Sequence, residues 1–384
     1  MHDRSRIGPV AYGLAFYLLL GALDVLSISA IGSFLKIAAL VPLGTMLLQV
    51  KELRLRFRSL FVLQIAFWLV ALISLFYTVS FDRTYLADIS LTLNLMLVLI
   101  LGVMVPYNQK ELDLLQKALL WGCWLQILLT LVFADISAAG RLTMRLGNST
   151  QDQNNNNTFF LYAFSYHCYR LLSGKEKRQI IPLVGMLVLV LFSGSRGALI
   201  AFALTFFFQI CVFFAKSEHP VRNILVVAVL MVVVGLAFDL ILEYLPESVS
   251  VRFSWEYLEE KGTTGRGKVW AYLLEVFQES GMPRMLFGHG YGTTVVVNEL
   301  NHHVAHNLYL DNLITLGIVG VGLQIASQGT VLYIFHKHKK YELMGAYVGM
   351  MGMCLSLSLT ASKPLWNMML IALTLDCNAS ETSA

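Results

Sequence analysis

Apolar runs long enough to cross a bilayer recur from one end of the sequence to the other. A helix needs about 20 residues to span a hydrocarbon core of about 30 Å. Backbone polar groups inside that core need internal partners, and a helix supplies them within one segment. Of the 384 residues, 57% are hydrophobic and only 14% are charged, which is far more apolar than a soluble domain. The sequence therefore predicts an all-α polytopic membrane protein, with one transmembrane domain over residues 1–384.

We expect about twelve spans and no cleavable signal peptide, because a second apolar run follows the first almost at once. The expected spans are 9–25, 28–49, 60–79, 87–106, 115–134, 158–172, 179–194, 197–215, 223–244, 306–335, 344–361 and 364–378. Alternation places both termini on one side, and most basic residues of the short connections fall on that side. The positive-inside rule then predicts cytoplasmic termini. Lys36 is the one basic residue expected deep within a span, and we assign it no role.

Two long polar segments fall on the opposite, extracytoplasmic side, at 134–157 and 245–305. The second contains an expected amphipathic helix near 268–279, lying at the membrane face. Its expected apolar positions are Val269, Leu273, Leu274 and Phe277, with Glu275 and Glu279 opposite. The glycine-rich stretch GHGYGTT follows as a turn, in which we expect the glycines to matter more than His289. Segment 245–305 is therefore the expected extracytoplasmic loop region.

Arg196 stands out because it lies on a very short turn between two expected spans, in SGSRGAL. Charges near hydrocarbon are costly and tend to face a cavity, a partner or a substrate. One interpretation is an arginine that reaches the outer headgroups. The other is a fixed cation that faces an anionic ligand at the outer membrane face.

Arg266 lies between two glycines just ahead of the expected amphipathic helix. Glycines let a backbone approach a bulky anion, and a helix N-terminus adds partial positive charge. A guanidinium offers a planar fork that suits a phosphate. Lys268 and Arg284 are weaker candidates for the same role, and an ordinary loop arginine is the alternative.

Three histidines precede the span that begins near residue 306: His302, His303 and His306. An imidazole can take a proton from a hydroxyl at neutral pH. His306 is followed by Asn307, Tyr309 and Asp311, polar groups able to orient it or to contact substrate. A zinc site and a merely solvated histidine are the alternatives, but no carboxylate or thiol with ligand spacing accompanies the histidines. We expect no metal and no cofactor.

The asparagine-rich tract TQDQNNNN, which includes Asn154, precedes the sixth expected span. It is either a flexible linker or a set of amides that line a path for sugar hydroxyls. The aromatic residues that could stack on sugars, or form an interfacial aromatic belt, are Tyr291, Trp255, Trp270 and Tyr309.

Four motifs in order, SGSRGAL, GRGKVW, LFGHGYGT and HNLYLDNLITLGIVG, resemble the O-antigen ligase and polysaccharide polymerase superfamily of bacterial cell-envelope glycan assembly. The specific part of the likeness runs from about 190 to 322. Its pattern carries over to Arg196, Arg266 and His306. Members often have an Asp-Pro-Asn element before the sixth span, whereas Gln153 stands here in place of the proline.

The resemblance implies about a dozen transmembrane helices with an extracytoplasmic loop domain, related to the class C glycosyltransferases, in the bacterial inner membrane. It implies transfer of a glycan from a polyprenyl-diphosphate donor, such as undecaprenyl diphosphate, to a sugar hydroxyl. His306 would be the base, and Arg196 and Arg266 would stabilise the leaving diphosphate without a metal. Asn307, Tyr309, Asp311, Lys268, Tyr291 and Asn154 are the expected substrate-binding residues.

The acceptor distinguishes two activities within this superfamily. A polymerase extends a lipid-linked repeat, and a ligase transfers to the lipid A core of lipopolysaccharide. We favour a polymerase, because the superfamily also serves capsule and exopolysaccharide systems that have no lipid A acceptor. A flippase or exporter of the lipid-linked oligosaccharide is the alternative class. We expect the lipid bilayer, but no nucleic acid, among its partners.

Overall fold

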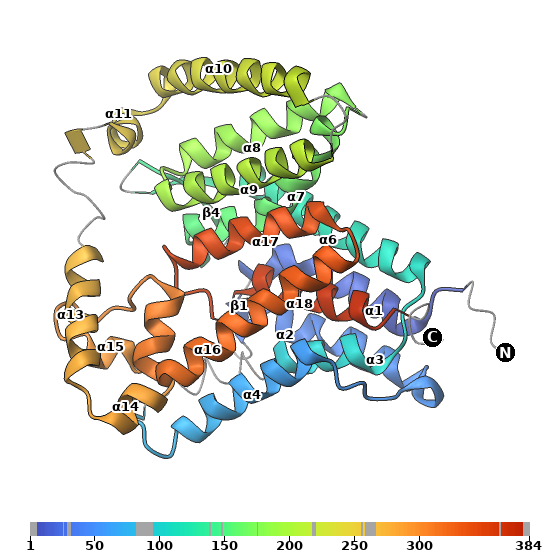
Figure 1. Cartoon of the computed structure of the whole chain (residues 1–384), viewed down its shortest axis with the longest axis vertical. Coiled ribbons are helices and arrows are strands. Elements are labelled where there is room, and N and C mark those ends of the chain that lie inside the picture. The colour runs from blue at the N-terminus through green and yellow to red at the C-terminus, as the bar shows by residue number, and fades with distance from the viewer. Residues whose placement is uncertain are drawn as a thin grey trace. The chain divides into compact units, whose positions relative to one another are not determined.

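A computed structural model describes residues 6–25, 27–28, 32–81, 95–137, 140–146, 149–174, 176–216, 220–254, 256–257, 266–360 and 362–378. The chain is mostly helical (Figure 1). It divides into two compact units. The first comprises Met1–Gly122, Thr264–His338 and Cys354–Ala384, and the second comprises Cys123–Thr263 and Lys339–Met353.

The first unit is built from the N-terminal helices together with the segments that follow residue 264. Its helices are α1 (Pro9–Leu19), α2 (Leu35–Ala38), α3 (Leu40–Leu47), α4 (Ser59–Ser74), a helix over Leu95–Met104, α13 (Arg266–Glu279), α14 (Met282–Phe287), α15 (Thr294–Val297), α16 (Leu308–Lys337) and α18 (Lys363–Asp376). Short 3-10 turns cover Leu20–Val25 and Val50–Glu52, and β1 (Ser27–Ile28) pairs with β2 (Gly32–Ser33). α16 packs against α4, α13, α14, α15 and α18 and is the centre of this unit.

The second unit contains the helices of the middle of the chain, several of them long and hydrophobic, together with one later helix. They are α7 (Gln153–Leu172), α8 (Ile180–Phe192), α9 (Arg196–Ala215), α10 (Pro220–Tyr244), α11 (Glu247–Ser250) and α17 (Tyr341–Cys354). Turns of 3-10 helix cover Lys177–Gln179 and Val251–Phe253, and β3 (Ala134–Ile136), β4 (Leu142–Leu146) and β5 (Ser149–Gln151) form an antiparallel sheet. α6 (Gln109–Val132) runs from the first unit into the second.

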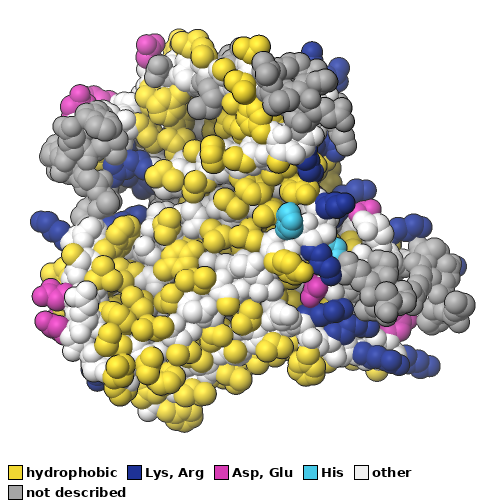
Figure 2. All heavy atoms as spheres, in the orientation of Figure 1, with side chains coloured by type: hydrophobic (Ala, Val, Ile, Leu, Met, Phe, Trp, Pro, Cys, Tyr) yellow, Lys and Arg dark blue, Asp and Glu magenta, His cyan; other side chains and the backbone are white. Residues whose placement is uncertain are grey.

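Most expected spans coincide with a helix, although the fourth is described only over Leu95–Met104. By length and composition, three of the described helices could cross a membrane: α6, α9 and α16. The protein is therefore a helical membrane protein, and the full count of spans stays a prediction. Figure 2 shows hydrophobic side chains over the face formed by α4 and α16, where Leu69, Ile73, Ile318 and Ile325 are exposed. Such a surface suits lipid.

The expected span 28–49 is not one continuous helix. Residues 32–33 form strand β2, which pairs antiparallel with β1, and α2 and α3 follow as two short helices. Pro42 lies in the first turn of α3, where the missing N–H group of proline costs no hydrogen bond. Lys36 is half-buried in α2 rather than deep within a long span.

The asparagine run is helical, so the flexible-linker interpretation is wrong. Asp152 caps α7, because its Oδ1 accepts from the backbone N–H groups of Asn154 (2.9 Å) and Asn155 (3.1 Å). The Asn156 Oδ1 accepts from Gln126 Nε2 at 2.6 Å, and Asn157 Nδ2 donates to Ser193 Oγ at 2.8 Å. These hydrogen bonds hold the asparagine side chains inside the helical packing.

Candidate active site

The helix that follows the histidines is broken. Gly317 has φ 66° and ψ −164°, and so divides α16 into an arm over 308–316 and an arm over 318–337. The Tyr309 hydroxyl donates to Gln328 Oε1 at 2.9 Å. On a straight helix these residues would lie about 28 Å apart along the axis. The first arm therefore folds back along the second (Figure 1), and the second arm alone still has the about 20 residues that a span needs.

The GHGYG loop supplies the hydrogen bonds that the break removes. His289 N donates to Ile314 O at 2.9 Å, and Gly290 N donates to Thr315 O at 3.0 Å. A Cβ on Gly288 would lie 2.3 Å from the Thr315 carbonyl carbon, and one on Gly317 would lie 2.4 Å from the Leu286 carbonyl carbon. Both glycines also have positive φ. As the sequence suggested, the glycines determine this turn.

The imidazole of His289 is buried beside this turn. Its Nε2 lies 3.1 Å from Ser280 Oγ. Burial lowers the pKa of His289, and the positive charge of Arg284 lowers it further. The neutral imidazole is therefore the form that the folded loop favours.

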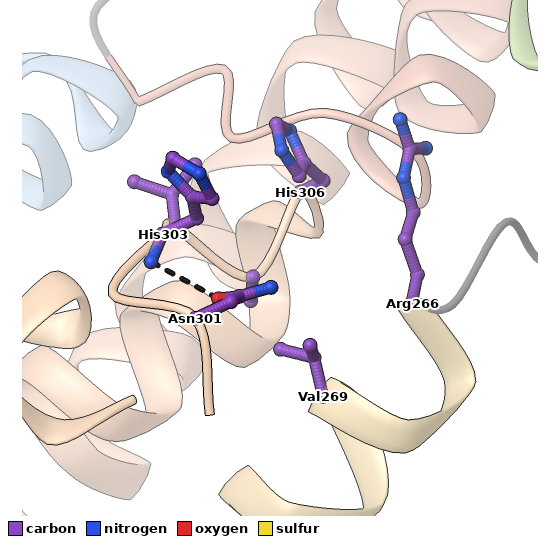
Figure 3. Close-up of a pocket in the computed structure, with 7 residues that line it drawn as sticks. Arg266, Val269, Asn301, His303 and His306 are labelled. Atoms are coloured by element: carbon purple, nitrogen blue, oxygen red, sulfur yellow. Dashed lines mark hydrogen bonds between the residues drawn. The ribbon is translucent and has the colours of Figure 1, made fainter. Parts of the chain in front are cut away.

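A cavity of about 310 Å³ opens at the start of α16 (Figure 3). The residues that line it are Arg266, Val269, Asn301, His303, Val304, Ala305 and His306. α13 contributes one wall, and the loop before α16 contributes the other. The cavity thus brings together Arg266 and His306, two of the three residues expected to carry the chemistry.

α13 occupies the stretch expected to form the amphipathic helix. Val269 and Leu273 are buried against Ala305, Leu310 and Ile314 of the loop and the first arm of α16. Leu274, which was expected on the same apolar face, is instead 44% exposed. The packing of α13 on α16 places Arg266, the first residue of α13, at the cavity, where its Nη1 donates to Ser356 O at 3.0 Å.

Hydrogen bonds hold both the residue before His306 and the residue after it. Ala305 N donates to Asp311 Oδ1 at 2.9 Å, and Trp270 Nε1 donates to Ala305 O at 2.8 Å. The Asn307 side chain caps α16 by accepting from the N–H groups of residues 309 and 310. These bonds hold His306 at φ 52°, an uncommon conformation for a residue with a side chain. The imidazole is therefore presented from a fixed loop.

Several expected substrate-binding residues lie outside the lining of this cavity. Asn307 caps a helix, Tyr309 bonds Gln328, and Asp311 is only 6% exposed. The second Asp311 oxygen accepts from the hydroxyl of Ser358. Tyr291 packs with Phe67, Ala71 and Leu316, and Lys268 is exposed on α13. In this structure Asn307, Tyr309 and Asp311 organise the loop and helix that carry His306.

Arg196 belongs to the second unit, where it begins α9. The Ser195 side chain caps this helix by accepting from Ala198 N at 3.1 Å, and it also donates to Asn154 Oδ1. The guanidinium of Arg196 lies 5.5 Å from the ring centroid of Tyr257. Asn154 is thus a neighbour of the SGSRG turn.

Two further arginines bind the backbone of the SGSRG turn. Arg141 Nε donates to Ser193 O at 2.7 Å, and Arg252 Nε donates to Gly194 O at 3.0 Å. They satisfy carbonyls at the end of α8. Together with Arg196 they make this turn strongly basic, a clustering that the sequence did not reveal because the three residues come from separate segments.

Asn301 was not predicted as a site residue, because only the fold of the loop turns it toward the cavity. The interpretation of the three histidines as a zinc site gains no support, since no group of three or more His, Cys, Asp or Glu side chains within the described ranges could hold a metal ion. Metal independence itself stays a prediction.

Residues 181–325 match a family model described as O-antigen ligase. The matched segment contains Arg196, Arg266 and His306. No curated protein matches the chain in a sequence search. The family match confirms the resemblance inferred from the motifs and supports a general role in glycan assembly of the ligase or polymerase type.

Proposed function

We propose that this chain, whose residues 181–325 carry the O-antigen ligase domain, is a membrane glycosyltransferase with a polyprenyl-diphosphate-linked glycan as its donor. The observation that carries the proposal is the meeting of Arg266 and His306 at one cavity, although 39 residues separate them in the sequence. A potential base and a fixed cation are the two groups that displacement of a diphosphate requires.

In the proposed reaction, the oxygen of an acceptor hydroxyl attacks the anomeric carbon of the donor sugar. The bond from that carbon to the diphosphate oxygen breaks, and its electron pair leaves with the diphosphate. His306 accepts the hydroxyl proton. Arg266 stabilises the negative charge of the leaving group through its planar fork of donors. Arg196 is proposed as a second cation for the same diphosphate.

The position of the imidazole supports a lipid-linked substrate. His306 immediately precedes the cap of the first arm of α16, which folds back along the second arm, and that second arm has the length to cross the bilayer. A polyprenyl anchor holds its diphosphate and first sugar close to the membrane surface. We place the cavity on the extracytoplasmic face of the bacterial inner membrane, with both termini in the cytoplasm. Labelling of Ser248→Cys in intact cells tests this topology, and labelling only from the cytoplasmic side would contradict it.

The decisive experiment is turnover by the purified protein of a synthetic polyprenyl-diphosphate repeat unit. As a polymerase, the activity we favour, the protein forms long chains on polyprenyl diphosphate without lipid A. A ligase instead requires a lipid A core acceptor. Absence of turnover with both acceptors would contradict the proposal.

Metal independence is part of the proposal, since two arginines supply the positive charge that a divalent ion would otherwise bring. Turnover should therefore survive EDTA. Loss of turnover with EDTA, and its recovery with one divalent ion, would return His302, His303 and His306 to consideration as ligands.

A flippase or exporter of the same lipid-linked glycan is the second candidate, and the break in α16 favours it. Discontinuous helices form the substrate and ion sites of many transporters. Here the Ile314 and Thr315 carbonyls at the break accept from the His289 and Gly290 amides, so the bonds are made within the protein. Transfer of labelled donor from one leaflet of a proteoliposome membrane to the other, without formation of a glycosidic bond, would identify a flippase.

A further inference from the structure

The amide of Asn301 has a defined orientation at the cavity. Its Oδ1 accepts from His303 N at 3.1 Å and from Asn298 Nδ2 at 2.8 Å. A backbone N–H can only donate, so the atom that faces it must be the amide oxygen. The Asn301 nitrogen therefore points away from His303, on the side of the cavity where Arg266 lies (Figure 3).

The neighbour that orients Asn301 is itself held firmly. Asn298 is fully buried, and its Nδ2 donates both to Asn301 Oδ1 and to His303 O, the latter at 2.7 Å. Its backbone N–H donates to Thr294 O at 2.8 Å. A rigid turn thus fixes the amide of Asn301, which lowers the entropy lost when that amide binds a ligand.

The side chains at this cavity offer more donors than acceptors. The guanidinium of Arg266 and the inward nitrogen of Asn301 can only donate, and the imidazoles of His303 and His306 can each donate one proton. None of the described lining residues is an aspartate or a glutamate. A ligand oxygen that accepts hydrogen bonds and carries no proton of its own complements such a surface best.

We infer that Asn301 is a specificity-determining residue, which donates a hydrogen bond to an acceptor-only oxygen on the sugar of the substrate. Two substituents share this chemistry: the carbonyl oxygen of an acylamino group and the carboxylate of a uronic acid. The inference rests on the proposed function in taking the ligand to be a lipid-linked sugar. It goes beyond that function by naming the sugar substituent and the residue that selects it.

Asn301→Asp tests the inference with almost no change of shape. One carboxylate oxygen still accepts from His303 N and Asn298 Nδ2, while the other replaces the inward donor with an acceptor. The control is Gln278→Glu, the same chemical change at an exposed position on α13 outside the cavity lining. The midpoint of thermal unfolding in detergent should be the same for both variants as for the wild type.

The affinity of each protein would be measured for three synthetic polyprenyl-diphosphate sugars, which carry an acetamido group, a carboxylate or only hydroxyls. The wild type should bind one of the first two about fivefold or more tightly than the third, as expected for one net hydrogen bond. Asn301→Asp should abolish this preference and weaken the carboxylate donor most, because like charges then face each other. Gln278→Glu should keep the wild-type preference.

An equal fold-loss of affinity for all three donors in Asn301→Asp, or no loss for any of them, would overturn the inference, because the preference among the three sugars would then be unchanged. Turnover of the same donors is measured in parallel and tests the proposed function separately. Selective binding without turnover would support the role of Asn301 and count against glycosyl transfer.

Discussion

Asp311 offers the sharpest test of which group is the base, because it is the nearest carboxylate to His306 in the sequence and yet does not line the cavity. Its oxygens already accept from Ala305 N and from the Ser358 hydroxyl. Asp311→Asn keeps an oxygen for the Ala305 N–H group, and the hydroxyl of Ser358 can rotate to accept from the new amide. We therefore expect this variant to turn over within about tenfold of the wild type, since the geometry around His306 persists.

Asp311→Ala should behave differently, because it removes the acceptor altogether. Ala305 is only 1% exposed, so its N–H group would lose its partner where water does not easily replace it. A buried donor without a partner costs about 1–3 kcal/mol, which corresponds to about 5- to 150-fold in rate if the cost falls on the active loop conformation. The thermal midpoint should fall as well.

Single-turnover rates across pH distinguish these roles. If Asp311 only positions the loop, Asp311→Asn keeps the acid limb that the wild type shows as its base becomes protonated. Asp311→Asn could instead lower the single-turnover rate as much as His306→Ala does and also remove the acid limb of the pH profile. That result would identify Asp311 as the base and refute the positioning argument.

The other predictions concern His306, the two arginines and His289. His306→Ala should lower the single-turnover rate about 10²- to 10⁴-fold and flatten the acid limb of the pH profile. Its donor affinity should stay nearly intact. Normal turnover by this variant would exclude His306 as the base. Arg196→Lys and Arg266→Lys keep the charge but lose the fork, so rate and donor affinity should fall together, and unchanged affinity would remove that arginine from the diphosphate site. The pKa of His289 is lowered in the folded protein, so the unfolded chain binds this proton at higher pH. Stability should then fall as pH drops below about 6.5 and level off once the folded imidazole also binds a proton. His289→Gln should make the thermal midpoint less sensitive to pH in this range. If the midpoint of the variant varies with pH as that of the wild type does, His289 is not the group responsible.

Much of the secondary structure follows from local properties of the chain. Apolar runs and helix-starting residues place helices at most of the expected spans, and the pattern around Val269 and Leu273 places α13. Asp152 and Asn307 cap α7 and α16 through local hydrogen bonds, although neither was predicted to be a helix cap. The ordered motifs also identify the family, and the family match includes the segment they occupy.

The arrangement of the site depends on contacts between distant segments. The hydropathy pattern over 306–335 resembles one long span, because Gly317 breaks the helix without adding a polar residue to the pattern. The break is possible because the amides of His289 and Gly290 take the carbonyls it frees, and because Gly288 lets the loop come close enough. Similarly, Asn301 faces the cavity only because Asn298 and His303 orient its amide. Local propensity acts over a few residues, whereas these hydrogen bonds close only when α4, α13, α14 and α16 pack together, and no periodicity in the sequence encodes that meeting.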